Sequence, residues 1–480
     1  MNIRAITALT ALLVVTVAQA GNFTQKNTDK AKALIDAAIE AHGGDALLDE
    51  LETMIVRQRS INHAVGQSLG TEPPWDTSEG TGYDAIDLAN SRYVNRNIGS
   101  GGGFQNDGGT IINGEESYQL NYRSGTVAKI AEPDFATASG PFVRVTPALL
   151  LRSLNERRAN AHYLGETEVD GRMFNVIGFS MTVGPAISLY FDKDTNRLHY
   201  SERVFPGFGL VEYIFDDYEK VDGIAVNKTF TLRLNGDINL EREILSVQVN
   251  EPLDTMLEVD EALVSIPAVS PDPLSRQELD EGVWLIGGNG TYAMFVDMGD
   301  YIFAAGGTAG IPERIASLRE VVGDKEIRYG MMSHHHFDHV LGVTAYEAEG
   351  ATLLAAKAHE RVMRNAADDG ESLKFKAVDG KMKLKGQRRV EIVDIGPTAH
   401  SEHLLVAYLP EERILFEADH FSLPQSGPAP PAVDSTRSFA RALQRLELDV
   451  VKIVSAHSSR VATMDDLDAA LGAEVYQARN

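Results

Sequence analysis

Four residues in one short stretch of the chain carry side chains that commonly bind metal ions. The stretch follows an apolar, strand-like run over residues 327–332 and reads His334, a second His, His336, Phe, Asp338 and His339. At the end of a strand, His334 and His336 can project to the same side and converge on one cation. Asp338 and His339, where a helix is predicted to begin, can turn toward a second cation close by. Imidazole nitrogens with one carboxylate suit zinc, and less exclusively iron or manganese.

Further candidate ligands follow downstream. His400, Asp419 and His457 each end a strand-like apolar run or lie just past one. Side chains at strand ends along one edge of a sheet can meet in a single shallow site. Packing alone does not explain the concentration of histidine in this part of the chain. Nine of the thirteen histidines lie here: His334, His335, His336, His339, His359, His400, His403, His420 and His457.

Residues 282–475 resemble the metallo-β-lactamase superfamily. The resemblance rests on the His-x-His-x-Asp-His motif, on His400-Ser401 after a Gly-Pro turn, and on an Asp and a late His that end two later strands. The spacings between successive motifs, 61, 19 and 38 residues, also fit. The resemblance implies a four-layer αβ/βα sandwich with a dinuclear metal site at one edge. By position, His334, His336 and His400 would hold the first zinc ion, Asp338, His339 and His457 would hold the second, and Asp419 would bridge them.

Two close cations are suited to hydrolysis. They lower the pKa of a water that bridges them to near neutrality, which supplies hydroxide where bulk water would be unreactive. One cation can polarise the scissile carbonyl while the other holds the leaving group. We expect Asp338 to orient the hydroxide and to handle its proton, because this carboxylate lies beside the ligands and can face the nucleophile.

Three positions refine the resemblance. Ser401, directly after the third His, resembles the lactamases proper. Asp419, where many lactamases have Cys, resembles the thioesterase, lactonase and phosphodiesterase branches, and a carboxylate bridge tolerates manganese or iron as well as zinc. The family usually has an Asp at the end of an early strand, but residues 304–308 contain no carboxylate. That Asp supports the metal-binding loop, and losses of this kind typically cost roughly 10–100-fold in affinity or activity. We therefore expect a domain that is slower, or differently braced, but remains active.

Several neighbours of the motifs are candidates for other roles. We expect His335 and Phe337 to point away from the metals and pack, and His359 to lie exposed on an Ala-rich helix. Tyr292 and Asn289, in an early hairpin, could line the pocket.

The composition and the first residues of the chain indicate an exported protein. The net charge of −25 over 480 residues, without a basic stripe, argues against a nucleic-acid partner. There is no Cys, which excludes disulfides and thiolate ligands. Arg4, an apolar run over residues 5–17 and the small-x-small pattern ending at Ala20 predict a signal peptide over residues 1–20. Cleavage after Ala20 would leave a periplasmic or secreted protein without an integral membrane span; an uncleaved N-terminal anchor is the alternative.

The chain is predicted to be α+β, with two domains. A helix over residues 29–41, short strands broken by Gly and Asn, and a helix over residues 147–158 predict a mostly antiparallel β domain at residues 21–262. Three prolines predict a linker at residues 263–281. Closely spaced strands, followed by alternating strands and helices, predict the layered second domain at residues 282–480.

The first domain weakly resembles the lipoprotein-carrier and lipoprotein-sorting domains of bacterial envelopes. The cues are the helix that ends in Ala41-His-Gly-Gly44, the turn at residues 192–197 and the segment at residues 215–224. Such domains are half-barrels with an apolar concavity. The resemblance implies contact with a lipid or a lipoprotein.

The function expected from the sequence is that of an exported metal-dependent hydrolase with two zinc ions per chain, in which manganese or iron could replace zinc. Its bridging hydroxide would attack an ester, thioester, lactone or amide carbonyl of a small-molecule substrate. Two alternatives stay open. One is a mononuclear-iron sulfur dioxygenase, which needs fewer ligands. The other is a lipid or lipoprotein carrier in which the metal domain is a passenger.

Overall fold

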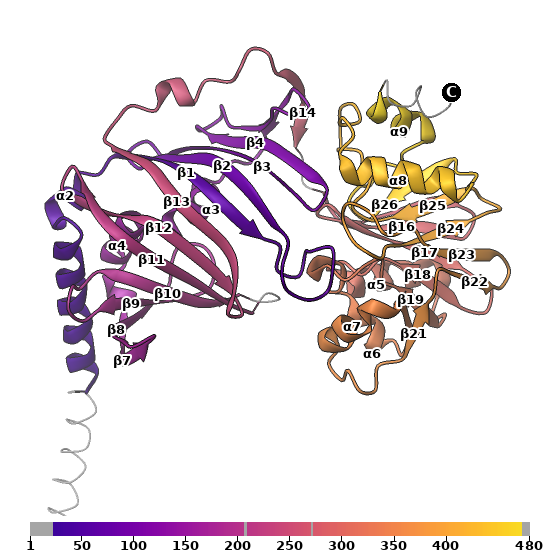
Figure 1. Cartoon of the computed structure of the whole chain (residues 1–480), viewed down its shortest axis with the longest axis horizontal. Helices are drawn as coiled ribbons and strands as arrows, with labels where there is room; N and C mark the ends of the chain where they lie inside the picture. Colours follow the sequence, from indigo (N-terminus) through magenta and orange to yellow (C-terminus); the bar gives the residue numbers. More distant parts are fainter. Residues whose placement is uncertain (1–22, 206–208, 270–271, 473–480) are drawn as a thin grey trace, which may run out of the picture.

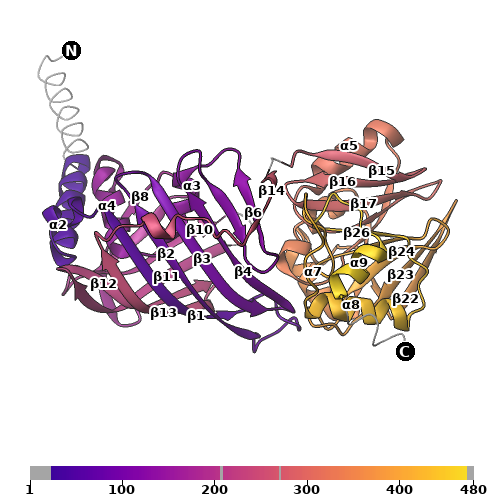
Figure 2. The same ribbon diagram turned by 90° about the horizontal axis from the view of Figure 1, so that it is seen from above.

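The computed structural model describes residues 23–205, 209–269 and 272–472. The predicted signal peptide therefore lies outside the described residues. The fold is α+β and largely sheet, as the sequence predicts, and the helix predicted over residues 29–41 begins earlier, at residue 23. The helices within the described ranges are too short or too polar to cross a bilayer. Figures 1 and 2 show the N-terminal and C-terminal halves end to end along the longest axis.

One sheet of 14 strands forms the N-terminal half, in the order β14-β6-β5-β4-β3-β2-β1-β13-β12-β11-β10-β9-β8-β7. Its neighbouring strands pair in antiparallel fashion, except for β14, which lies parallel to β6 at one edge. The strands are β1 (Thr53–His63), β2 (Thr77–Asp87), β3 (Arg92–Gly101), β4 (Phe104–Ile112), β5 (Tyr118–Asn121), β6 (Thr126–Ile130), β7 (His162–Val169), β8 (Arg172–Phe179), β9 (Ile187–Asp192), β10 (Leu198–Phe205), β11 (Gly209–Val221), β12 (Ile224–Leu234), β13 (Asp237–Val249) and β14 (Val264–Val269).

Helices cover one face of this sheet and fill its concavity. The helix at residues 23–41 buries an apolar stripe that includes Ile35 and Ile39, and it is followed by α2 (Asp45–Asp49), α3 (Phe135–Arg144) and α4 (Pro147–Glu156). Leu149 and Leu150 of α4 pack in one core with the strand side chains. A space of about 20 Å³ remains where α3 and α4 meet the sheet, and one of about 140 Å³ lies beside the same two helices. A larger open cleft of about 720 Å³ is lined by residues of β7, β8, β9 and β10. The chain itself therefore fills most of the concavity under α3 and α4.

Helix α3 was not predicted from the sequence. It contains Gly140 and Pro141, which are both poor helix formers in a helix interior. Its N-terminus is stabilised by Asp134, whose carboxylate accepts hydrogen bonds from the backbone N–H groups of Ala136 and Thr137. Phe142 then anchors the helix in the core.

Two facing sheets form the C-terminal half. The first contains β15 (Ser275–Asp280), β16 (Val283–Gly288), β17 (Thr291–Asp297), β18 (Ile302–Ala305), β19 (Ile327–Met331), β20 (Thr352–Ala356) and β21 (Phe375–Val378), and the second contains β22 (Lys381–Lys385), β23 (Arg389–Asp394), β24 (Leu405–Leu409), β25 (Ile414–Glu417) and β26 (Lys452–Ser455). The core between them includes Phe303, Met331 and Phe416.

Helices cover the outer faces of both sheets. A second core, which includes Ile315 and Phe295, joins the first sheet to α5 (Ile311–Val322), α6 (Val343–Ala348) and α7 (Glu360–Ala366). A third core, which includes Phe439 and Leu415, joins the second sheet to α8 (Asp434–Arg445) and α9 (Met464–Leu471). The C-terminal half is thus a four-layer αβ/βα sandwich, as the sequence predicts.

The stretch predicted as a linker, residues 263–281, contains two strands. β14 extends the N-terminal sheet and β15 begins the first C-terminal sheet. The pairing of β14 with β6 shifts register between Ile266 and Val269, around Pro267, which has no backbone N–H to donate. Proline is tolerated here because β14 is an edge strand.

Candidate metal centre

The seven residues predicted as ligands lie together at one edge of the sandwich. The loop after β19 carries His334, His336, Asp338 and His339, and Asp419 and His457 follow β25 and β26. His400 lies between β23 and β24. Because these strand ends share an edge, residues more than 100 positions apart become neighbours.

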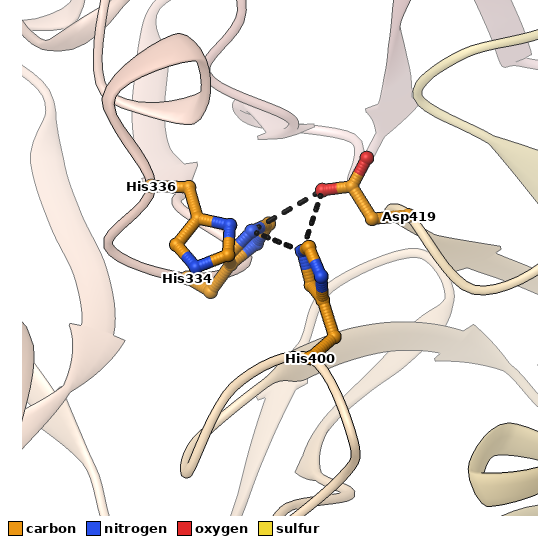
Figure 3. Close-up of side chains that lie close together, drawn as sticks. All are labelled: His334, His336, His400 and Asp419. Atoms are coloured by element: carbon orange, nitrogen blue, oxygen red, sulfur yellow. Dashed lines mark hydrogen bonds and ion pairs between the residues drawn. The ribbon is translucent and has the colours of Figure 1, made fainter. Parts of the chain in front are cut away.

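The first group consists of His334, His336, His400 and Asp419 (Figure 3). The Nε2 atoms of His334 and His400 are 3.1 Å apart. Asp419 Oδ2 lies 3.2 Å from His334 Nε2 and 3.4 Å from His400 Nε2. The imidazole ring of His336 is centred 4.3 Å from the rings of both other histidines. Three nitrogens and one carboxylate oxygen therefore face a common point.

The second group consists of Asp338, His339 and His457. His339 Nε2 lies 3.1 Å from His457 Nε2 and 3.3 Å from Asp338 Oδ2. Asp419 also contacts this group, because its Oδ2 is 2.7 Å from His339 Nε2 and its Oδ1 is 2.7 Å from His457 Nε2. Asp419 therefore lies between the two groups and is placed to be shared by both.

The surroundings of the first group keep its imidazoles neutral and its carboxylate ionised, so that their lone pairs are free to bind a metal ion. Burial, together with the neighbouring imidazoles, lowers the pKa of His334 and His336 well below the usual range. Burial opposes ionisation of Asp419, but His339 and the other histidines hold the pKa of this carboxyl well below its usual range. Neutral imidazoles beside an ionised carboxylate are the protonation states that a divalent cation requires.

In the second group, the carboxylates stabilise a protonated imidazole. Burial lowers the pKa of His339, but the charges of Asp419 and Asp338 outweigh it and raise the pKa to about 10. Burial raises the pKa of Asp338, but His339 and a hydrogen bond from Gln67 bring it to about 2. These carboxylates thus form a pocket of negative charge that a second cation can occupy in place of the proton.

In His336 and His400, the ring nitrogen that points away from the centre of the first group supports metal binding by the other nitrogen. His336 Nε2 lies 3.0 Å from the carbonyl oxygen of Ser68, and His400 Nδ1 lies 2.9 Å from that of Gly102. Because a carbonyl only accepts, these nitrogens carry the protons, which leaves His336 Nδ1 and His400 Nε2 as lone pairs that face the centre. Within the part of the chain that the structure describes, His336 Nδ1 is buried without a hydrogen-bond partner. These residues fit a metal ion.

The N-terminal half supplies both of these carbonyl groups. Figure 1 shows the connection between β1 and β2 extending from the N-terminal sheet to the C-terminal half. In this connection, Ser68 O contacts His336 and Gln67 Nε2 donates to Asp338 Oδ1 at 2.8 Å. The turn between β3 and β4 brings Gly102 O to His400, and the Phe104 ring lies edge-on to the same imidazole at 5.1 Å.

The sequence analysis did not predict these contacts of the N-terminal half with the candidate ligands, although a run of glycines marks one of them. The turn contains the run Gly101-Gly102-Gly103. Gly103 has a φ of 80°, and a Cβ there would lie 3.0 Å from Ala399 O and 3.1 Å from Ser435 N. An added Cβ would require the turn or its neighbours in the C-terminal half to shift by a few tenths of an ångström, and the positive φ also favours glycine here.

The other predicted neighbours have mixed outcomes. His335 is buried and its Nε2 lies 3.0 Å from Gly70 O, and the backbone N–H of Phe337 donates to Gly66 O. The prediction that His359 is exposed is wrong, because the side chain is buried with its ring 4.9 Å from that of His335. Tyr292 lines a cleft beside His457.

The loop that carries His339 is supported although residues 304–308 lack the Asp that the family usually has there. Ala305 is buried, and Tyr346 donates to Gly306 O at 2.8 Å. A Cβ at Gly307 would lie 2.2 Å from Met332 Sδ and 2.3 Å from His339 O. Direct backbone packing therefore occupies the space next to the metal-binding loop.

Comparison with known proteins identifies the class of the C-terminal half. The family model of the metallo-beta-lactamase superfamily matches residues 305–457, and the C-terminal half of the chain belongs to this superfamily. No match is found among curated proteins.

Solved structures that are similar to part of this chain include several metallo-beta-lactamases. A metallo-beta-lactamase from Pontibacter korlensis is 16% identical, with 42% of this chain and 97% of that chain covered and a TM-score of 0.35. The mono-zinc form of the metallo-beta-lactamase FIM-1 from Pseudomonas aeruginosa is 19% identical, with 43% and 96% covered and a TM-score of 0.34. A metallo-beta-lactamase from Hirschia baltica is 19% identical, with 41% and 96% covered and a TM-score of 0.33.

Proposed function

We propose that the chain is a metal-dependent hydrolase with two divalent cations, zinc or alternatively manganese or iron, that cleaves the acyl bond of an ester, thioester, lactone or amide. The observation that carries the proposal is the position of Asp419, whose Oδ2 lies 3.2 Å from His334 Nε2 in the first group and 2.7 Å from His339 Nε2 in the second. In this proposal His334, His336 and His400 hold one cation, Asp338, His339 and His457 hold the other, and Asp419 bridges them. When bound, such cations activate water and polarise a carbonyl oxygen.

Asp338 is the residue we assign to the attacking water. Its carboxylate, with a pKa of about 2, stays ionised at neutral pH and can accept a hydrogen bond from that water. Gln67 holds Oδ1, so that Oδ2 stays directed at the metal centre. The reaction adds water across the acyl bond, which leaves a carboxylic acid and the protonated leaving group.

The test of this function is a hydrolysis screen over esters, thioesters, lactones, amides and β-lactams, with and without a chelator. We expect turnover that is lost on chelation and restored by added zinc or manganese. Turnover that survives complete removal of metal, or none with any acyl substrate, would contradict the proposal.

The two alternatives have less support. A mononuclear-iron dioxygenase would leave the second group of ligands without a role. A carrier would need an apolar cavity for a lipid chain, whereas the cleft of about 720 Å³ in the N-terminal half has His162, Glu202 and Arg203 in its lining. Export to the periplasm or the exterior rests on residues 1–20 and stays a prediction.

A further inference from the structure

A cleft of about 380 Å³ adjoins the candidate metal centre at His457. Both halves of the chain line it. The C-terminal half contributes His457, Tyr292 and the loop at residues 422–430, and the N-terminal half contributes Gln119 and Asn121 of β5 and residues just beyond. Its volume falls in the range of small-molecule pockets, about 300–1,000 Å³. A substrate whose reacting bond lies at the metal centre could thus extend along this cleft.

The lining of the cleft carries no Lys or Arg among the described residues. Its one carboxylate, Asp272, accepts hydrogen bonds from Gly290 N and the Tyr292 hydroxyl. The lining is otherwise made of amide, hydroxyl and apolar groups, which include Gln119, Asn121 and several prolines of the loop. Apart from His457, the proposed metal ligand at one end of the cleft, the described lining therefore offers no cationic side chain to bind an anionic group.

Two arginines donate hydrogen bonds to the backbone of this loop and of the two residues that follow it. Arg460 Nη1 donates to Pro424 O at 2.7 Å and to Gly427 O at 2.9 Å. Arg123 Nη2 donates to Pro431 O at 2.7 Å and to Ala432 O at 3.1 Å. These contacts brace the loop that forms one wall of the cleft, and they direct both guanidinium groups toward carbonyl oxygens.

We infer that this cleft selects an uncharged acyl substrate, such as a neutral ester or lactone, over substrates with a carboxylate or phosphate in the part that the cleft binds. The inference rests on the proposed hydrolase function and names its substrate class. Moving an anion out of water without a partner costs several kcal/mol, and the net charge of −25 repels anions further. Amides and hydroxyls, in contrast, can replace the hydrogen bonds that a neutral polar substrate makes with water.

The test compares two substrates that differ in one charge: the 4-nitrophenyl ester of glutaric acid with its second carboxyl free, and the same ester with that carboxyl methylated. For the metal-loaded protein we expect kcat/KM to be at least about tenfold higher for the neutral compound, which corresponds to roughly 1.4 kcal/mol. Equal or faster hydrolysis of the anionic compound would overturn the inference and leave the hydrolase function intact.

A charge placed in the cleft provides the matched control. Gln119 and Ser246 are both exposed, and Ser246 lies outside the lining of the cleft, so both Gln119→Lys and the control Ser246→Lys should fold. Gln119→Lys should raise kcat/KM for the anionic ester by about three- to tenfold, whereas Ser246→Lys should leave the ratio of the two substrates unchanged. An unchanged ratio in Gln119→Lys would contradict binding in this cleft.

A binding measurement with analogues that are not hydrolysed tests the selectivity of the cleft independently of the hydrolase function. The ketone analogues of the two esters, in which a CH2 group replaces the ester oxygen, cannot be hydrolysed and can be titrated by calorimetry into the metal-loaded protein. Preferential binding of the neutral ketone would support the cleft even if neither ester is hydrolysed, a result that would instead contradict the hydrolase function. Equal binding, or tighter binding of the anionic ketone, would overturn the inference.

Discussion

Gln67 Nε2 donates a hydrogen bond to Asp338 Oδ1 at 2.8 Å, although the two residues are 271 positions apart in the chain. The contact joins the β1–β2 connection of the N-terminal sheet to the carboxylate that we assign to the attacking water. With the carbonyl groups of Ser68 and Gly102, it makes the N-terminal half a structural part of the candidate metal centre. The two halves therefore act as one site.

The variant Gln67→Ala should weaken metal binding in the second group. Loss of the hydrogen bond lets the Asp338 carboxylate rotate, and losses of this kind typically reduce metal affinity by roughly 10–100-fold. Calorimetric titration with zinc should show the weaker of two binding steps shifted by this factor, with the first step nearly unchanged.

A control for this variant lies in the same connection. Glu72 forms an ion pair with Arg361. Glu72→Gln disturbs the connection without removing a contact to a proposed ligand, so both zinc-binding steps should match those of the wild type. Equal effects of Gln67→Ala and Glu72→Gln would show that Gln67 has no specific role.

The turn that contacts His400 should be intolerant of a side chain. Gly103→Ala places a Cβ 3.0 Å from Ala399 O, which should move Gly102 O away from His400 and lower zinc affinity. Gly114→Ala is the matched control, since Gly114 also has a positive φ, 58°, and no atom within 4 Å of the added Cβ. Both should lose roughly 1–2 kcal/mol of stability from the left-handed backbone. If both variants bind zinc equally, the close approach does not position His400.

The clustering of the seven candidate ligands could be predicted from the sequence because each candidate sits at or just past a strand end, and strand ends share an edge of the sheet. The alternation of strands and helices after Pro312 predicted a layered α/β domain, and the resemblance to the metallo-β-lactamase superfamily implied the four-layer sandwich. The roles of Ser68 and Gly102 could not be predicted, because a backbone carbonyl carries no residue identity and its partner is more than 200 positions away. His359 was placed on the surface by its Ala-rich surroundings, whereas tertiary packing against His335 buries it.

Stability should depend on pH through His42 in the N-terminal half. Burial lowers the pKa of His42 to about 4, although a hydrogen bond to Ala38 O opposes the shift. Between pH 4 and about 6.5 the unfolded chain binds more protons at this residue, so the free energy of unfolding rises with pH across this window. Relative to its value above pH 6.5, the free energy of unfolding is lower by about 3 kcal/mol near pH 4 because His42 must then be protonated or kept neutral at a cost.

Urea unfolding of the wild type and of His42→Gln, at several pH values from 4 to 7.5, measures this contribution. The difference in the free energy of unfolding between the two proteins should change by about 3 kcal/mol over the window. Other buried histidines titrate equally in both proteins and cancel in the difference. A difference that is independent of pH would contradict the assignment.

The number of metal ions in the purified protein tests the account most directly. Elemental analysis by mass spectrometry, with protein concentration from amino-acid analysis, counts the ions per chain. The two ligand groups that share Asp419 predict two divalent ions per chain, zinc or alternatively manganese or iron. A single iron ion per chain, unchanged when zinc or manganese is supplied in excess, would contradict the two-metal centre and favour a mononuclear dioxygenase.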